Sequence, residues 1–450
     1  MVAPRVAQSQ YLKGFISKGL SVSLFLMLFV PPLFILPGRY HGRWIFVNYE
    51  EPKFVAVQVL CWLFLSFFWL NLVFSNELEE RLRRVARDKW LHLLVLFFIY
   101  LCLTTVNSLV VEASLYELFQ YFTLINVVMA LGALTQDARW LRRAMVSICS
   151  SFVVMVALGY CQMFIDIPWL EPIRSGALFP STMGYKNPAG LSVTAQWFLL
   201  AGLVYDAFEK GRWRWGLLGV LLLMAEAGYI AAIQSRTSYL AFTVGIILLL
   251  VFFLLAMVKR GWSVRRVGAV TLALFLVAFL VFAAVLKLYP RAHGRFLMAI
   301  KYIKTPSAFL NCDRGTYLRN SIIMANSKLL GVGIGNWAFA YPIMRKVNPG
   351  LCFGRRIQVT RAHGDYAQML GEAGWPGLLL WAVLLGWVAL RGLRTAFSSS
   401  NPLDLFVVIQ LSVFMTLMLT DYVIQMAYHK FALFVLFALA ISAPRMHGEI

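Results

Sequence analysis

The residues best suited to chemistry lie in one short polar stretch, 361–377, which reads RAHGDYAQMLGEAGWPG. His363, Asp365 and Glu372 all fall within it, just ahead of a glycine- and proline-containing break and a long apolar run. An imidazole can accept a proton near neutral pH, and a neighbouring carboxylate can orient its ring. The stretch therefore predicts a general base, His363, with Asp365 as the side chain that orients it.

Arginines in several segments of the chain could bind a phosphate-bearing substrate. The candidates are Arg174, Arg236 and Arg314, with Arg319 and Arg361 as further members of the group. A planar guanidinium pairs with phosphate oxygens through two parallel hydrogen bonds, and an unpaired one at the end of an apolar span is costly. Two other interpretations stay open: a snorkelling membrane anchor for Arg236, and a generally basic surface that attracts anionic lipid.

Metal ligands do not accompany these residues in any familiar pattern. The sequence between the predicted spans has no DxD, HExxH or Cys/His ligand spacing, so we expect no metal and no cofactor. Four of the six cysteines fall in apolar spans and suit packing. Cys312 and Cys352 lie outside the spans, where an oxidising compartment would allow a disulfide.

The composition places the chain in a membrane. Hydrophobic residues make up 60% and charged residues only 14%, whereas soluble domains carry about 25% charged residues. The apolar runs approach the roughly 20 residues that cross a bilayer as a helix, which indicates an all-α polytopic protein. Because that excludes a soluble nucleic-acid binder, the net charge of +21 indicates no nucleic-acid partner.

We predict about twelve transmembrane helices and a single large loop. The loop, 288–374, separates a first membrane region, 1–287, from a second, 375–450. The division between the third and fourth spans is the boundary with the weakest signal. The predicted spans are 17–37, 54–75, 91–112, 115–134, 144–165, 188–206, 216–233, 238–258, 267–287, 375–391, 403–420 and 426–443.

Orientation follows from the basic residues. The segments on the side of the two termini hold 21 of the 41 lysines and arginines, and the short segments on the opposite side hold seven. By the positive-inside rule, both termini are cytoplasmic and the large loop is periplasmic. The remaining thirteen fall between 287 and 372, with three acidic residues among them. This excess is consistent with a cavity for a phosphate-bearing substrate.

The large loop is predicted to be partly helical. The stretches 289–305 and 313–330 place apolar residues at helical spacing, with Asp313 able to cap the second. GVGIGNW, residues 331–337, should break that helix, since its glycines allow positive φ and close backbone approach. No lysine followed by serine or threonine comes after it, so it is not a phosphate loop of the Walker type.

Four short motifs within residues 170–385 resemble those of the bacterial O-antigen ligase and polymerase superfamily, and they occur along the chain in the order that the family has. HGDYAQMLGEAGWPG is similar to its H-N-x-Y/F-L-Q-x-x-x-E-x-G-x-x-G signature, and GVGIGNWAFAYP to its G-x-G-x-N-x-F stretch. SRTSYLAF is similar to its S-R-x-x-x-L/W segment, and RSGALFPSTMGYKNPAGL to its R-x-x-G-x-x-x-N-P-N segment. Two positions depart from the pattern: Gly364 replaces an asparagine, and Ala189 with Gly190 replaces another.

The resemblance implies a GT-C-like membrane glycosyltransferase. Its implied reaction is transfer of a glycan from undecaprenyl pyrophosphate to a sugar hydroxyl of lipid A-core, at the periplasmic face of the bacterial inner membrane. It implies that His363 is the catalytic base and that Arg236 and Arg314 hold the pyrophosphate, without metal and with inversion. The side chains expected to bind substrate are Arg174, Asn187, Arg319, Arg361, Asp365 and Tyr366.

Two alternatives stay open. A polymerase of the same superfamily would extend the glycan rather than transfer it to lipid A-core; one large and one modest loop favour the ligase. A transporter of lipid or polysaccharide would need ionisable residues at mid-span and paired broken helices. Glu226 is the one clear mid-span acid, and no inverted repeat is evident.

Overall fold

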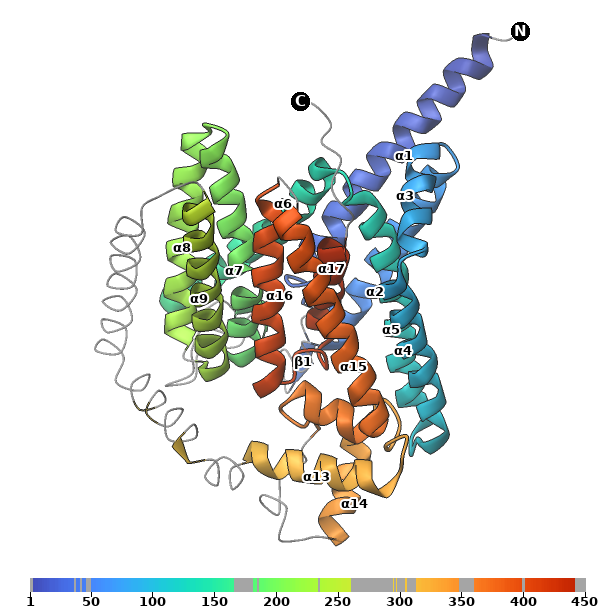
Figure 1. Ribbon diagram of the computed structural model, residues 1–450, viewed down its shortest axis with the longest axis vertical. Coiled ribbons are helices and arrows are strands. Elements are labelled where there is room, and N and C mark those ends of the chain that lie inside the picture. Colours follow the sequence, from blue (N-terminus) through green and yellow to red (C-terminus); the bar gives the residue numbers. More distant parts are fainter. Residues whose placement is uncertain are drawn as a thin grey trace.

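The protein is a bundle of long helices with a small helical cap at one end (Figure 1). The computed structural model describes residues 3–35, 38–40, 43–45, 50–165, 181–183, 186–233, 235–259, 294, 297, 304–305, 313–347, 360–398 and 401–441. In this part of the chain the only strands are β1 (Gly38–Tyr40) and β2 (Arg43–Ile45), an antiparallel pair with Arg39 opposite Trp44. The all-helical membrane fold is confirmed.

Nine described helices are long and apolar enough to cross a membrane, and two shorter apolar helices follow them. Eleven of the twelve predicted spans therefore have a helix at the expected place. The remaining one, 267–287, lies outside the described residues, so the count of twelve stays a prediction. The eleven helices are α1 (Ala3–Phe29), α2 (Glu50–Leu72), α4 (Lys89–Thr104), α5 (Val111–Leu134), α6 (Ala138–Phe164), α7 (Lys186–Glu209), α8 (Trp213–Ile233), α9 (Arg236–Lys259), α15 (Asp365–Ser398), α16 (Leu403–Thr420) and α17 (Ala427–Ile441).

The boundary between the third and fourth spans is real. α4 gives way to a single 3-10 turn at Thr105–Asn107, and the chain has reversed by Val111, where α5 begins. Thr104 and Thr105 return hydrogen bonds from their hydroxyls to the carbonyls of Leu101 and Cys102, three residues back. Such back-bonding competes with the regular helix ladder and accompanies its end here.

Side chains cap the first turns of three helices at the end of the bundle opposite the α4–α5 connection. Ser75 precedes the short helix α3 (Asn76–Ala86) and accepts from the backbone N–H of Leu78 at 3.3 Å. Asp88 caps α4 by accepting from Trp90 at 3.0 Å, and Asp137 caps α6 by accepting from Arg139 at 2.8 Å. These caps satisfy backbone donors that the first helical turn leaves without partners.

The cap that follows α9 consists of α13 (Asp313–Ser327), α14 (Trp337–Val347) and the first turns of α15. We call the end of the bundle that carries α13 and α14 the site end. α1 begins and α17 ends at the opposite end (Figure 1). α13 confirms the helix predicted at 313–330, whereas the stretch 289–305 lies almost entirely outside the described residues. A small second core built on Trp337, Tyr317 and Tyr341 holds the cap together.

α15 is one run of helix with a sharp kink. Gly374 has φ 68° and ψ −175° inside it, at the boundary predicted between the large loop and the next span. Pro376 follows and has no N–H, so the carbonyl of Glu372 loses its helical donor. The backbone N–H of Gly333 takes that place at 2.9 Å, and the N–H of Val332 bonds the carbonyl of Gly371 at 3.0 Å.

The glycine-rich turn 331–337 is shaped for this contact. Gly331, Gly333 and Gly335 all have positive φ, as the sequence predicted. A Cβ on Gly333 would lie 2.3 Å from the hydroxyl oxygen of Ser108, so the turn packs directly on the α4–α5 connection. The Tyr100 hydroxyl donates to the carbonyl of Ala373 at 2.7 Å from the same side. The cap is thus fixed to the bundle at the kink.

Gly374→Ala is expected to destabilise the protein. Alanine at φ 68° is strained, and its Cβ would lie 2.1 Å from the carbonyl oxygen of Leu329, so the loss should be at least about 2 kcal/mol. Thermal unfolding of the purified protein in detergent measures it. The matched control is Gly386→Ala in the same helix, where a Cβ meets nothing within 4 Å and unfolding should occur at the wild-type temperature or above. Equal melting temperatures for the two variants would contradict the kink.

Candidate active site

His363 lies at the site end, two residues before α15 begins. Its backbone has φ 50°, a left-handed conformation that costs energy in a residue with a side chain. Its ring stacks on Tyr317 of α13 with centroids 5.6 Å apart and meets the ring of Tyr422 edge-on at 4.8 Å. The side chain stays 35% exposed. A strained backbone that presents a histidine between two aromatic rings suggests a reacting group.

Asp421, at the end of α16, joins His363 to Arg314. One carboxylate oxygen lies 3.6 Å from Nδ1 of His363, and the other lies 3.7 Å from Nη2 of Arg314. The backbone N–H of Tyr422 donates to the first oxygen at 3.0 Å. Asp421 is fully buried, and a buried carboxylate needs the nearby cation to offset the cost of desolvation.

This arrangement determines what the imidazole can do. The carboxylate faces Nδ1, so the tautomer with its proton on Nδ1 is the favoured one, and Nε2 is left to accept a proton. Arg314 on the same carboxylate brings a guanidinium to the His363 site. The three side chains thus combine a proton acceptor, an orienting acid and a cation for a developing negative charge.

Asp365 contacts the backbone beside this centre. Its carboxylate is fully buried and accepts from the backbone N–H groups of Val423 at 2.8 Å and Ile424 at 3.0 Å. It therefore fixes the irregular segment 421–426 between α16 and α17, which carries Asp421. The roles predicted for Asp365 stay predictions: in the structure its carboxylate bonds the backbone that follows Asp421, and the Asp421 carboxylate is the one that lies 3.6 Å from the His363 ring.

The other predicted residues of the large loop surround this centre unequally. The Arg361 guanidinium lies over the ring of Tyr422, 4.8 Å from its centroid. Tyr366 packs against the main apolar core, and its hydroxyl lies 3.5 Å from the carbonyl of Met415. Arg319 is half-buried on α13, five residues after Arg314. Arg361 thus lies beside Tyr422 at the centre, whereas Tyr366 faces the bundle.

A second group of motif residues gathers where α7 and α9 begin. Asn187 is the second residue of α7, and Arg236 begins α9 with an exposed side chain. A Cβ on Gly190 would lie 2.6 Å from the hydroxyl of Ser238, so the two helix starts are in close contact. In the described part of the chain no ion pair joins Arg236 to Asp421. Arg174, like Cys312 and Cys352, lies outside the described residues.

Asn336 and Glu372 connect the glycine-rich turn to the His363 loop. The Asn336 amide oxygen accepts from Val110 at 2.7 Å, and its nitrogen donates to the hydroxyl of Ser114 at 2.9 Å. Glu372 accepts from the N–H of Trp337 at 3.2 Å and from the Gln368 amide at 3.0 Å. Gln368 in turn accepts from the N–H of Ala362 at 3.1 Å. Asn336 and Glu372 of the motifs therefore support the backbone that carries His363.

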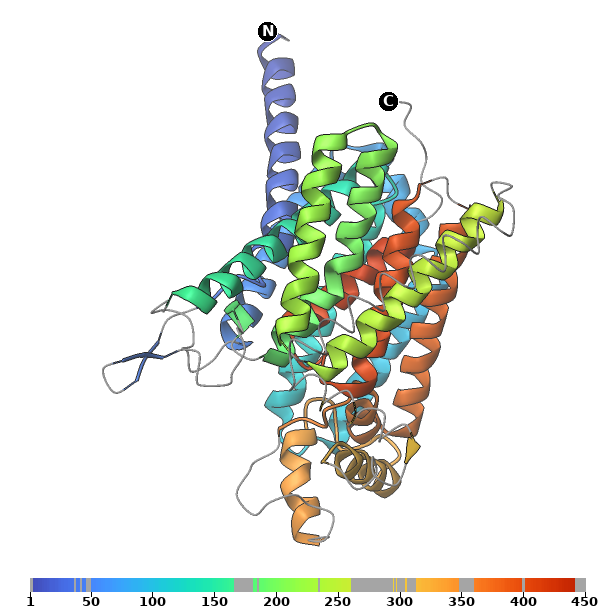
Figure 2. The same cartoon turned by 90° about the vertical axis from the view of Figure 1, so that its left-hand side faces the viewer.

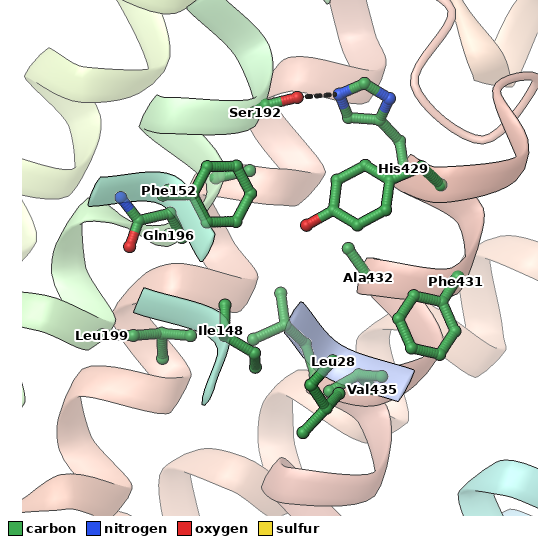
Figure 3. A pocket seen from close by; sticks show the side chains of 13 residues that line it. Leu28, Ile148, Phe152, Ser192, Gln196, Leu199, His429, Phe431, Ala432 and Val435 are labelled. Carbon is green, nitrogen blue, oxygen red and sulfur yellow. Dashed lines mark hydrogen bonds between the residues drawn. The ribbon is translucent and has the colours of Figure 1, made fainter. Parts of the chain in front are cut away.

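Polar residues also occur inside the bundle. His429 of α17 shares a 2.8 Å hydrogen bond with Ser192 of α7, beside a cavity of about 20 Å³ whose lining is mostly apolar (Figure 3). Gln196 donates to the mid-span acid Glu226 at 2.7 Å. The cavity has room for about one water molecule. These contacts indicate polar packing between helices rather than a passage.

The described residues include no group of three or more His, Cys, Asp or Glu side chains that could hold a metal ion.

Part of the chain that includes His363 matches a known protein family. Residues 218–382 match the O-antigen ligase family. No curated protein matches the chain. The family match confirms the resemblance to the O-antigen ligase and polymerase superfamily that the motifs indicated.

The O-antigen ligase match runs from α8 into α15 and includes Arg236, Arg314 and His363. Asp421 lies beyond its end. A motif comparison could not reveal this carboxylate, because it falls 58 residues after His363 in chain order, on a different helix end. The sequence contained one signal: Asp421 directly follows the predicted span 403–420 and lies on the same predicted side of the membrane as His363.

Two substitutions of His363 test its strained backbone. Glycine adopts φ 50° without strain, so the free energy of unfolding of His363→Gly should exceed that of His363→Ala by roughly 1 kcal/mol. The glycine variant should therefore unfold at the higher temperature. Flexible glycine ordinarily makes a protein less stable than alanine does, so the expected order is reversed. Thermal unfolding of the two purified variants decides it. An alanine variant more stable than the glycine variant would show that the loop is not held in this conformation.

Proposed function

We propose that this protein is an O-antigen ligase. It transfers a glycan from undecaprenyl pyrophosphate to a sugar hydroxyl of lipid A-core, a step of lipopolysaccharide biosynthesis. The observation that carries the proposal is the placement of His363 and Arg314 on the single buried carboxylate of Asp421, with both residues inside the O-antigen ligase match. Base and cation stand together where an acceptor hydroxyl and a departing pyrophosphate must meet.

The reaction is a single displacement. Nε2 of His363 takes the proton from the acceptor hydroxyl while that oxygen forms a bond to the anomeric carbon. The bond from the same carbon to the pyrophosphate oxygen breaks, and undecaprenyl pyrophosphate leaves with the bonding electrons. Attack from the face opposite the leaving group inverts the configuration. Arg314 and Arg236 stabilise the charge on the pyrophosphate, and Asp421 stabilises the imidazolium that forms.

The site end faces the periplasm in this proposal, and both termini are cytoplasmic. The arrangement of the helices supports it, since α1 begins and α17 ends away from α13 and α14 (Figure 2). The excess of lysine and arginine on the side of the termini gives the direction. The protein therefore resides in the inner membrane, where the polyprenyl tail of the donor and the acyl chains of the acceptor remain in the bilayer.

Removing the base or its carboxylate should abolish transfer. His363→Ala is expected to lower kcat about 100-fold or more, and Asp421→Asn should also lower kcat because the imidazole loses its orienting charge. The assay follows transfer from lipid-linked glycan to lipid A-core by the purified protein. Controls are His92→Ala, an exposed histidine at the opposite end, and Asp404→Asn, a buried acid at the other end of α16. Normal transfer by His363→Ala would refute the assignment of His363 as the general base.

The same assay separates ligase from polymerase. Offered lipid A-core and a second lipid-linked glycan together, the wild-type protein should form lipid A-core carrying the glycan. A product extended on the polyprenyl carrier would instead identify a polymerase.

Transfer should not require a divalent metal. In the proposed step arginine side chains supply the positive charge that a metal would otherwise bring to the pyrophosphate. The rate is therefore expected to be unchanged after exhaustive treatment with EDTA, and added Mg²⁺ or Mn²⁺ should not raise it. A rate that vanishes with chelator and returns with metal would overturn this mechanism.

A further inference from the structure

A polar cleft of about 340 Å³ lies at the site end, next to the His363 centre. α5 contributes Tyr116, Glu117 and Gln120 to its lining, and α15 contributes Gln368. Gln425, from the segment between α16 and α17, and Arg361 line it as well. We call it the Glu117 cleft. Its volume falls within the range of about 300–1,000 Å³ of sites that hold small molecules.

The charges of the Glu117 cleft do not suit a pyrophosphate. Glu51 and Glu117 both line it, and among the described residues that line it Arg361 is the one cation. The nearby Lys430 is almost fully buried, and its ammonium group pairs with the carboxylate of Glu117. A di-anionic group would meet carboxylates that are not offset by a surplus of positive charge, so the cleft needs a neutral ligand with many hydroxyls.

Saccharide hydroxyls match what the lining offers. Three glutamines, a tyrosine and the Glu117 carboxylate supply both donors and acceptors, which a sugar ring requires on its edges. Gln120 is buried with its amide nitrogen 3.5 Å from Glu117, and Gln425 is half-buried at the wall. Buried polar groups of this kind discriminate strongly for a ligand that completes their hydrogen bonds.

The cleft adjoins the reacting histidine through two side chains. Arg361 lines the cleft and packs over Tyr422, and Tyr422 touches the ring of His363. Gln368 also lines the cleft, and its amide oxygen accepts from Ala362, the residue before His363. A sugar bound in the cleft therefore lies beside the side chains that contact the His363 ring and its backbone.

We propose that the Glu117 cleft binds the acceptor saccharide and presents its hydroxyl to His363. This inference rests on the proposed function and adds to it the place of the second substrate: the acceptor approaches from the α5 side, and the donor pyrophosphate from the α13 side, where Arg314 lies. Gln425 and Gln120 are the side chains that recognise the acceptor sugar, and Arg361 lies between the two substrates.

Two variants test the cleft. Gln425→Ala removes an amide from the wall, and Ala338→Leu fills part of the space, since Ala338 also lines the cleft. The probe is core oligosaccharide released from lipopolysaccharide by mild acid, titrated into the full-length protein in nanodiscs. Both variants should bind it at least tenfold more weakly than the wild type. Undecaprenyl pyrophosphate should bind all three proteins equally.

Matched controls exclude general effects. Gln10→Ala changes an exposed glutamine of α1, and Ala86→Leu enlarges an exposed alanine of α3; both should bind the oligosaccharide like the wild type. In turnover, the two cleft variants should raise KM for the acceptor and leave KM for the donor unchanged. Unchanged oligosaccharide affinity in both cleft variants, or weakened donor binding instead, would overturn the proposal.

The binding measurement needs no turnover, so the two proposals fail separately. A protein that binds the oligosaccharide in the cleft yet transfers no glycan would refute the ligase function and support the cleft as a saccharide site. A protein that transfers glycan normally while both cleft variants keep wild-type affinity would support the ligase and refute the cleft.

Discussion

Pro376 cannot donate a backbone hydrogen bond, and the rest of the site end depends on how the freed carbonyls of α15 are satisfied. The glycine-rich turn supplies the donors from Val332 and Gly333, and Tyr100 bonds the carbonyl of Ala373. A buried carbonyl without a partner costs about as much as a lost hydrogen bond. The turn is therefore held to the kink, and α13 and α14 on either side of it come to lie over the start of α15.

The motif residues divide into two groups when they are placed on this framework. Glu372 and Gln368 form a chain of hydrogen bonds from the N–H of Trp337 to the N–H of Ala362, and Asn336, the residue before Trp337, is bonded to Val110. These side chains are almost fully buried and support the backbone that leads to His363. His363 and Arg314 keep part of their side chains exposed. The first group supports the backbone of the site, and the second group keeps part of its side chains accessible.

Much of this was predictable from the sequence, because it depends on local pattern. Apolar runs indicated the spans, glycines indicated the positive-φ turn, and the break at Gly374 marked a helix boundary. Asp365 and Asp421 show what local sequence pattern could not predict, namely which carboxylate lies near the His363 ring. One residue separates Asp365 from His363, which made it the natural partner, but its carboxylate bonds the backbone of Val423. Asp421 is distant in the chain, and only the packing of α15 against α16 brings it to the imidazole.

The segment 421–426 also fixes an order of events in biogenesis. α16 and α17 are the last helices of the described chain, and the segment between them carries the Asp421 carboxylate, which lies 3.6 Å from the His363 ring. A chain emerging from the ribosome thus delivers its histidine and both arginines before it delivers Asp421. Asp365 can bond to Val423 and Ile424 only after α16 has been made, so the centre is complete only once the segment 421–426 has joined it. A nascent chain without that hairpin carries every motif and no finished site.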